Sequence, residues 1–187
     1  ADSIINVLTE NHLLKKQSHR YIQALNMKAD AFFNKAMYNE SYDLYYKAKK
    51  LATENSDSCS LSQYSYSLGM VLYRQQRYQD AAKYFGDAID EIGHCVDRFI
   101  FFYRKQEILD NIGLCYYHMG AYDRAMQYYA KTIALVDSNY LNYGRNEGVY
   151  ISAKAVAYGN MADIYIGLGN FDTAAVLLKK SMAVNIR

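Results

Sequence analysis

The chain has 187 residues, of which 51% are hydrophobic and 21% are charged, and its formal net charge is +2. This amount of apolar material predicts a folded globular protein and excludes a disordered chain. Basic and acidic residues are interleaved along the sequence, so the charge pattern predicts no nucleic-acid interface and no anionic-membrane surface in this segment.

The composition favours helices throughout. There is no proline and there are only 10 glycines, while good helix formers are plentiful and the β-branched runs typical of strands are missing. We therefore predict an all-α fold. No apolar run approaches the roughly 18 residues that cross a bilayer, so we expect no membrane span in this segment.

The chain opens with an apolar stripe over residues 2–17 that predicts a helix. It would be a capping helix or the second helix of a preceding repeat. Further along, the segments 53–63 and 137–148 have the Ser, Asn, Asp and Gly content of loops.

Between these two segments, residues 97–119 predict one long helix. Gly93 would end the helix before it, and Asp97 would cap its amino end.

An aromatic residue follows a turn at four places in the chain, Tyr38, Tyr78, Tyr122 and Phe171. The third residue after each is small, namely Ser41, Ala81, Ala125 and Ala174. The seventh is large and apolar, namely Tyr45, Phe85, Tyr129 and Leu178. The tenth is small again, namely Ala48, Ala88, Thr132 and Ser181. The ninth residue before each aromatic is also small, namely Ala29, Gly69, Gly113 and Ala162.

This pattern resembles the tetratricopeptide-repeat family, whose unit is a pair of antiparallel helices packed through small residues. The resemblance implies a right-handed α-α superhelix of about nine helices in a single domain, 1–187. Its parts would be 1–21 (the capping helix or partial repeat) and four repeats, 22–61, 62–105, 106–154 and 155–187. With no polar cap expected after the last repeat, we interpret the chain as a fragment of a longer protein.

The repeats are longer than those of the family, which usually span about 34 residues. The aromatic positions are 78−38=40, 122−78=44 and 171−122=49 residues apart. We therefore expect lengthened helices or loops between repeats.

Three cysteines, Cys59, Cys95 and Cys115, lie far apart with no C-x-x-C pair. We expect neither a disulfide framework nor a zinc-ligand spacing, and we interpret all three as buried thiols.

No catalytic constellation is visible. The four histidines lack an H-E-x-x-H motif or a ligand partner one helical turn away. The G-x-G of residues 167–169 falls in a helix turn with no preceding strand. We therefore predict no metal, no cofactor and no enzymatic activity.

The 21 tyrosines either fill volume in place of leucine or line a binding surface. In the family that the chain resembles, the first helix of each pair lines a concave groove. The peptide-binding candidates on that face are Asn26, Asp30, Tyr66, Met70, Tyr73, Glu107, Asp110, Leu114, Tyr117 and Asp163.

Some family members hold a partner's terminal carboxylate with Lys, Asn and Arg side chains. The corresponding positions here are Asn26, Asp30, Ser67, Glu107 and Asn111, so this clamp is absent. Acidic residues stand where cations are needed and would repel a carboxylate. We expect instead a basic-amphipathic peptide or helix as the partner.

The sequence therefore predicts a non-catalytic protein-protein interaction module. The alternative is a ligand-sensing segment of a bacterial signalling protein, a sensor kinase or a transcription regulator. Uncovered terminal repeats would allow self-association. A cytoplasmic location is the default expectation, and a periplasmic one applies if a signal peptide has been removed.

Overall fold

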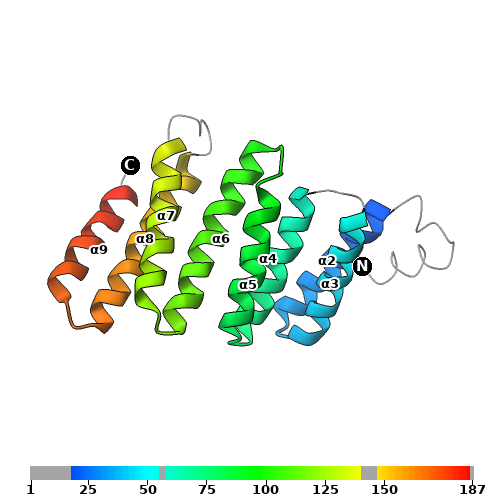
Figure 1. Cartoon of the computed structure of the whole chain (residues 1–187), viewed down its shortest axis with the longest axis horizontal. Coiled ribbons are helices and arrows are strands. Elements are labelled where there is room, and N and C mark those ends of the chain that lie inside the picture. Colours follow the sequence, from blue (N-terminus) through cyan, green and yellow to red (C-terminus); the bar gives the residue numbers. More distant parts are fainter. Residues whose placement is uncertain (1–17, 55–57, 140–146, 186–187) are drawn as a thin grey trace. The chain divides into compact units, whose positions relative to one another are not determined.

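The computed structural model describes residues 18–54, 58–139 and 147–185. Within these ranges the chain is helical apart from short turns, as the composition predicts (Figure 1). The helices are α2 (Ser18–Asn34), α3 (Tyr38–Glu54), α4 (Ser58–Arg74), α5 (Tyr78–Ile92), α6 (Arg98–His118), α7 (Tyr122–Asn139), α8 (Glu147–Gly167) and α9 (Phe171–Asn185).

Two compact units divide the chain at Val96 and Asp97. The first contains α2 to α5 and the second contains α6 to α9. In each unit consecutive helices pack as antiparallel pairs, α2 with α3, α4 with α5, α6 with α7 and α8 with α9. We call the first member of each pair an A helix and the second a B helix. The helix expected over residues 2–17 lies outside the described residues.

The bounds predicted for the loop 53–63 are wrong at both ends, because α3 continues to Glu54 and α4 begins at Ser58, while residues 55–57 lie outside the described part. The serines of this stretch suggested a turn, but two serines of this region are buried in α4. Ser62 donates its hydroxyl to the carbonyl of Ala88 in α5 at 2.9 Å, and Ser65 donates to Glu91. The hydroxyls therefore join neighbouring helices.

The bounds predicted for the loop 137–148 are wrong at both ends, since α7 reaches Asn139 and α8 begins at Glu147. Residues 140–146 lie outside the described part. The boundaries predicted around α6 are confirmed. Gly93 caps the carboxyl end of α5, and the Asp97 carboxylate accepts a hydrogen bond from the Ile100 amide at 2.9 Å.

The four aromatic residues of the repeated pattern are the first residues of the four B helices. Each turn before them has the same hydrogen bonds. In α6, for example, the Gly120 amide donates to the Tyr117 carbonyl and the Ala121 amide donates to the Tyr116 carbonyl, both at 2.9 Å. This is a Schellman motif, which requires a left-handed residue. The four left-handed positions are Ala36, Gln76, Gly120 and Gly169, with φ of 58°, 61°, 72° and 73°.

The small positions of the pattern are buried, as predicted. Ser41, Ala81 and Ala125 have no exposed surface and Ala174 has 2%. The small residues of the A helices permit a close approach by an aromatic ring of the B helix. A Cβ atom added to Gly69 would lie 2.6 Å from the Phe85 ring, closer than side chains pack.

The second unit repeats this contact. A Cβ atom added to Gly113 would overlap the Tyr129 ring. Tyr129 is fully buried, and α8 covers it with Ala157, Met161 and Ile164. Tyr129 therefore joins its own A helix, α6, to the next one, α8.

A disulfide links Cys59, in the first turn of α4, to Cys95, just after α5. The expectation that these residues are free thiols is wrong, because the antiparallel pairing of α4 and α5 brings their Cα atoms to 4.8 Å. Only Cys115 is confirmed as a buried free thiol, and burial raises the pKa of its thiol to about 12.

The left-handed turns generate a stability prediction. Ala36→Gly and Gln76→Gly should each raise the free energy of unfolding by about 0.5 kcal/mol, because glycine adopts positive φ without a Cβ clash. The matched changes Gly120→Ala and Gly169→Ala should lower it by about 1 kcal/mol. Urea denaturation measures both. Equal destabilisation by all four substitutions would contradict this account.

The disulfide generates a second prediction. Its cysteines are 36 residues apart. Closing a loop of that length lowers the conformational entropy of the unfolded chain, which raises its free energy by about 3 to 4 kcal/mol. Reduction should therefore lower the free energy of unfolding by up to that amount. As a control, the double variant Cys59→Ser/Cys95→Ser should show no response to reductant. A comparable loss on adding reductant to the double variant would assign the effect to another cause.

Candidate functional site

The ten predicted site residues divide equally between the two units. In the first unit they lie on α2 and α4, and in the second on α6 and α8. All are A-helix residues, as the pattern predicts. Their partners in the structure differ between the two units.

In the first unit, Asp30 is an exposed carboxylate at the centre of a small polar cluster. It accepts hydrogen bonds from the side-chain amide of Asn26 at 3.0 Å and from the Tyr45 hydroxyl. Burial, followed by the bond to Asp30, raises the pKa of Tyr45, so the phenol stays protonated and donates. The side-chain oxygen of Asn26, Oδ1, is buried with no hydrogen-bond partner.

The predicted aromatic residues of this unit are half-buried. The Tyr66 ring packs on Phe85 with centroids 5.6 Å apart, and the Tyr73 ring meets Tyr78 edge-on at 5.5 Å. Met70, one turn from each of them on α4, is also half-buried. These tyrosines therefore fill volume between α4 and α5 and also present an edge at the surface.

In the second unit, Asp110 of α6 bonds to a neighbouring A helix. One carboxylate oxygen accepts a hydrogen bond from the side-chain amide of Asn160 in α8 at 3.0 Å, and the other is buried without a partner. Burial raises the pKa of Asp110 from 3.8 to about 6, and the Asn160 bond opposes this rise. At neutral pH the site therefore holds a carboxylate with fewer donors than its charge needs.

Glu107, one turn before Asp110 on α6, has a different partner. Arg104 pairs with it at 2.6 Å, and Tyr103 also bonds to it. Burial raises the pKa of Glu107, although Arg104 and Tyr103 lower it. The nearby Leu114 and Tyr117 are half-buried, and Asp163 of α8 is exposed. The Tyr117 ring packs against the Tyr122 ring with centroids 5.8 Å apart.

Sequence reasoning missed Asn160 and Arg104. Asn160 lies one turn before the predicted Asp163 on α8, so the same helical spacing would have selected it. Arg104 lies three residues before Glu107, the usual distance for an ion pair on a helix. Arg104 reduces the negative charge of the predicted groove, and Asn160 occupies one of its carboxylate oxygens.

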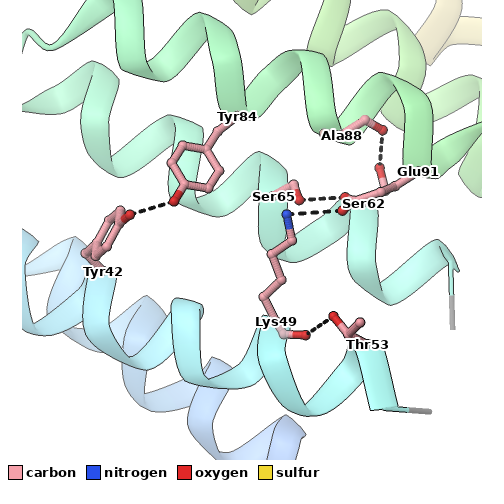
Figure 2. A network of polar contacts seen from close by, with 8 residues as sticks. All are labelled: Tyr42, Lys49, Thr53, Ser62, Ser65, Tyr84, Ala88 and Glu91. Carbon is pink, nitrogen blue, oxygen red and sulfur yellow. Dashed lines mark hydrogen bonds and ion pairs between the residues drawn. The ribbon is translucent and has the colours of Figure 1, made fainter. Parts of the chain in front are cut away.

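A surface that the sequence did not indicate lies in the first unit between the B helices α3 and α5. Tyr42, Tyr46 and Lys49 of α3 line a hollow of about 310 Å³ together with Tyr84 of α5. Figure 2 shows the polar contacts of this region, with Tyr42 and Tyr84 pointing toward one another.

The last B helix carries an exposed apolar stripe. Phe171 and Met182 of α9 are 66% and 63% exposed, and Leu178 is 40% exposed, whereas Tyr129 at the position equivalent to Leu178 is buried under α8. This stripe is the physical basis for the expected self-association, which stays a prediction.

Among the described residues, no group of three or more His, Cys, Asp or Glu side chains could hold a metal ion. None of the described helices combines the length and the apolar character needed to cross a membrane.

Three tetratricopeptide-repeat family models match the sequence, at residues 66–90, 108–139 and 155–185. These matches fall on α4 with α5, α6 with α7 and α8 with α9. A search of curated protein sequences finds no match.

Among solved structures, the chain is similar to BtubC (BKLC) from P. vanneervenii, with a TM-score of 0.72 and 17% sequence identity. The similarity covers 89% of this chain and 63% of BtubC, so the chain spans less than two thirds of that protein's length. At this identity the likeness shows a shared fold. The helix pairs, the Schellman turns, the buried small positions and the three matching family models together show that the chain belongs to the tetratricopeptide-repeat family.

Proposed function

We propose that this chain is a non-catalytic interaction module whose A helices bind a peptide or helix carrying Lys or Arg beside apolar anchors. Tetratricopeptide repeats are in general protein-protein interaction modules, which supports the class of function. The candidate surface of the second unit consists of Glu107, Asp110, Leu114, Tyr117 and Asp163. That of the first consists of Asn26, Asp30, Tyr66, Met70 and Tyr73.

The observation that carries the proposal is the incomplete set of donors around Asp110. A buried carboxylate normally accepts several hydrogen bonds, yet one oxygen here has no partner and the other has only Asn160. A Lys or Arg side chain would supply the missing donors together with the opposite charge. Asp110 is partly exposed but its unpartnered oxygen is buried, so the contact requires the Asp110 side chain to rotate toward the surface.

The neighbouring groups define the rest of the partner. Asp163 adds a second, exposed carboxylate on α8, whereas Glu107 is already neutralised by Arg104. Leu114 and Tyr117 follow Asp110 on α6 and are half-buried, so their exposed parts can pack against an apolar residue. A partner with one or two cations next to a Leu or Phe side chain would fit this arrangement.

Peptide binding to the intact chain tests the proposal. A fluorescein-labelled amphipathic helix of Lys and Leu should bind at least tenfold more tightly than the same helix with Glu in place of Lys, as measured by anisotropy. Asp110→Asn should weaken the Lys peptide by about five- to tenfold, because it removes the charge and retains the shape.

Asp123→Asn is the matched control, since Asp123 is an exposed acid on the B helix α7 of the same unit. It should leave the affinity unchanged. Equal binding of the Lys and Glu peptides would show that the proposal is wrong. An equal loss from both aspartate changes would place the contact outside this surface.

The raised pKa of Asp110 makes the binding depend on pH. Below about pH 6 the free carboxyl is protonated, whereas a bound cation favours the ionised form and lowers its pKa. The affinity for the Lys peptide should therefore rise by up to about tenfold between pH 5 and pH 7.5. In Asp110→Asn this rise should shrink, and a pH profile identical to that of the parent chain would exclude Asp110 as its cause.

A further inference from the structure

The hollow between α3 and α5 in the first unit has the properties of a second binding surface, and it is independent of the A-helix function proposed above. We call it the tyrosine groove and define it by Tyr42, Tyr46 and Lys49 of α3 with Tyr84 of α5. A second hollow, of about 380 Å³, lies along α3 and shares Tyr46 and Lys49 with the first, which measures about 310 Å³. Its other lining residues are Lys50 and Thr53. Each hollow falls in the usual size range of ligand sites.

The tyrosine rings have a regular arrangement. Tyr42 and Tyr46 stack with their planes 9° apart and their centroids 6.3 Å apart. Tyr84 meets Tyr42 edge-on at 86°, and their hydroxyls share a hydrogen bond of 2.7 Å (Figure 2). Tyr46 is 54% exposed. The groove therefore presents an accessible ring next to a ring that a neighbouring helix holds in place.

The base of the groove is fixed by a polar network. The Lys49 ammonium pairs with Glu91 of α5 at 3.1 Å and lies over the Tyr84 ring at 5.7 Å from its centroid. Glu91 also accepts the Ser65 hydroxyl of α4 (Figure 2). The ion pair is only about one-fifth exposed at each side chain. It connects α3 to α5 across α4, so the groove is formed before any ligand arrives.

The charges at the two ends differ. Lys50 is exposed beside Tyr46, Lys49 and Thr53. At the other end, Arg77 and Asp80 neutralise each other through contacts of 2.6 and 2.9 Å. Lys83 and Asp87, which also line the hollow there, add one charge of each sign and no net charge. The end of the groove near Lys50 is therefore the one that attracts an anion.

We propose that the tyrosine groove binds a proline-rich segment of a partner protein, with an acidic residue of that segment next to Lys50. Proline-rich chains form an extended helix with a rise of about 3.1 Å per residue, and aromatic grooves recognise it. One face of such a helix repeats every three residues, or about 9.3 Å, so a proline on that face can pack on the exposed ring of Tyr46, which is stacked on Tyr42. Tyrosine hydroxyls can also donate to its unpaired carbonyls.

The test uses the intact chain with its disulfide and two synthetic probes, both acetylated and amidated. The first is a run of six prolines followed by two glutamates. The second replaces the prolines with three Gly-Ser units and so has the same charge without the proline helix. Titration calorimetry should show at least tenfold tighter binding of the proline probe. A proline probe ending in two lysines should bind less tightly than the one ending in glutamates.

Three variants locate the contact. Tyr46→Ala should weaken the proline probe at least fivefold, whereas Tyr46→Phe, which keeps the ring, should retain most of the affinity. Lys50→Glu should weaken binding, and a control change, Lys179→Glu, should not, since Lys179 is also exposed but lies on α9 of the other unit. Because these side chains are exposed, the unfolding temperature of each variant should equal that of the parent chain.

Two results would overturn the inference. One is equal affinity for the proline and Gly-Ser probes, which would show that the groove recognises only the negative charge that both probes carry. The other is a proline probe whose binding ignores both Tyr46→Ala and Lys50→Glu, which would place it on another surface. Neither result bears on Asp110 and the A helices. The proposed function is therefore tested separately, by the Lys and Glu peptides and Asp110→Asn.

Discussion

The contact that the rest of the structure depends on is the one between a glycine of an A helix and an aromatic ring of its B helix. Phe85 lies against Gly69 and Tyr129 against Gly113 so closely that a methyl group in place of hydrogen would overlap the ring. Glycine inside a helix costs about 0.5 to 1 kcal/mol relative to alanine. The burial of a whole aromatic side chain contributes more, about 1.5 to 3 kcal/mol. In the second unit the Tyr129 ring also reaches the next A helix, so one contact sets the spacing within and between pairs.

The sequence predicted this framework because small and large residues recur at fixed offsets from an aromatic start, and those offsets survive changes in repeat length. It could not predict the link between Cys59 and Cys95, which are 36 residues apart and meet only because α4 and α5 run antiparallel. The first serines of α4, up to Ser62, were misassigned to a loop for a related reason. The Ser62 hydroxyl is satisfied by a carbonyl of α5, a helix that local composition does not reveal.

The candidate site was predictable in its residues and not in its electrostatics. Helical spacing selected Glu107 and Asp110, but their partners decide what they can bind. Arg104 neutralises the first, and Asn160 of another helix satisfies only half of the second. The tyrosine groove escaped sequence reasoning altogether. It depends on Tyr42 and Tyr84, which are 42 residues apart, sharing one hydrogen bond across two B helices.

The link between Cys59 and Cys95 also changes how the chain would respond to a pulling force. It joins the start of one A helix to the end of its B helix, so tension applied at the two termini passes through the sulfur atoms and bypasses the residues between them. The residues between the two cysteines would therefore bear no tension while the rest of the chain extends. The intervening segment could add about 120 Å to the length of the stretched chain. It would add that length only after a reductant breaks the disulfide.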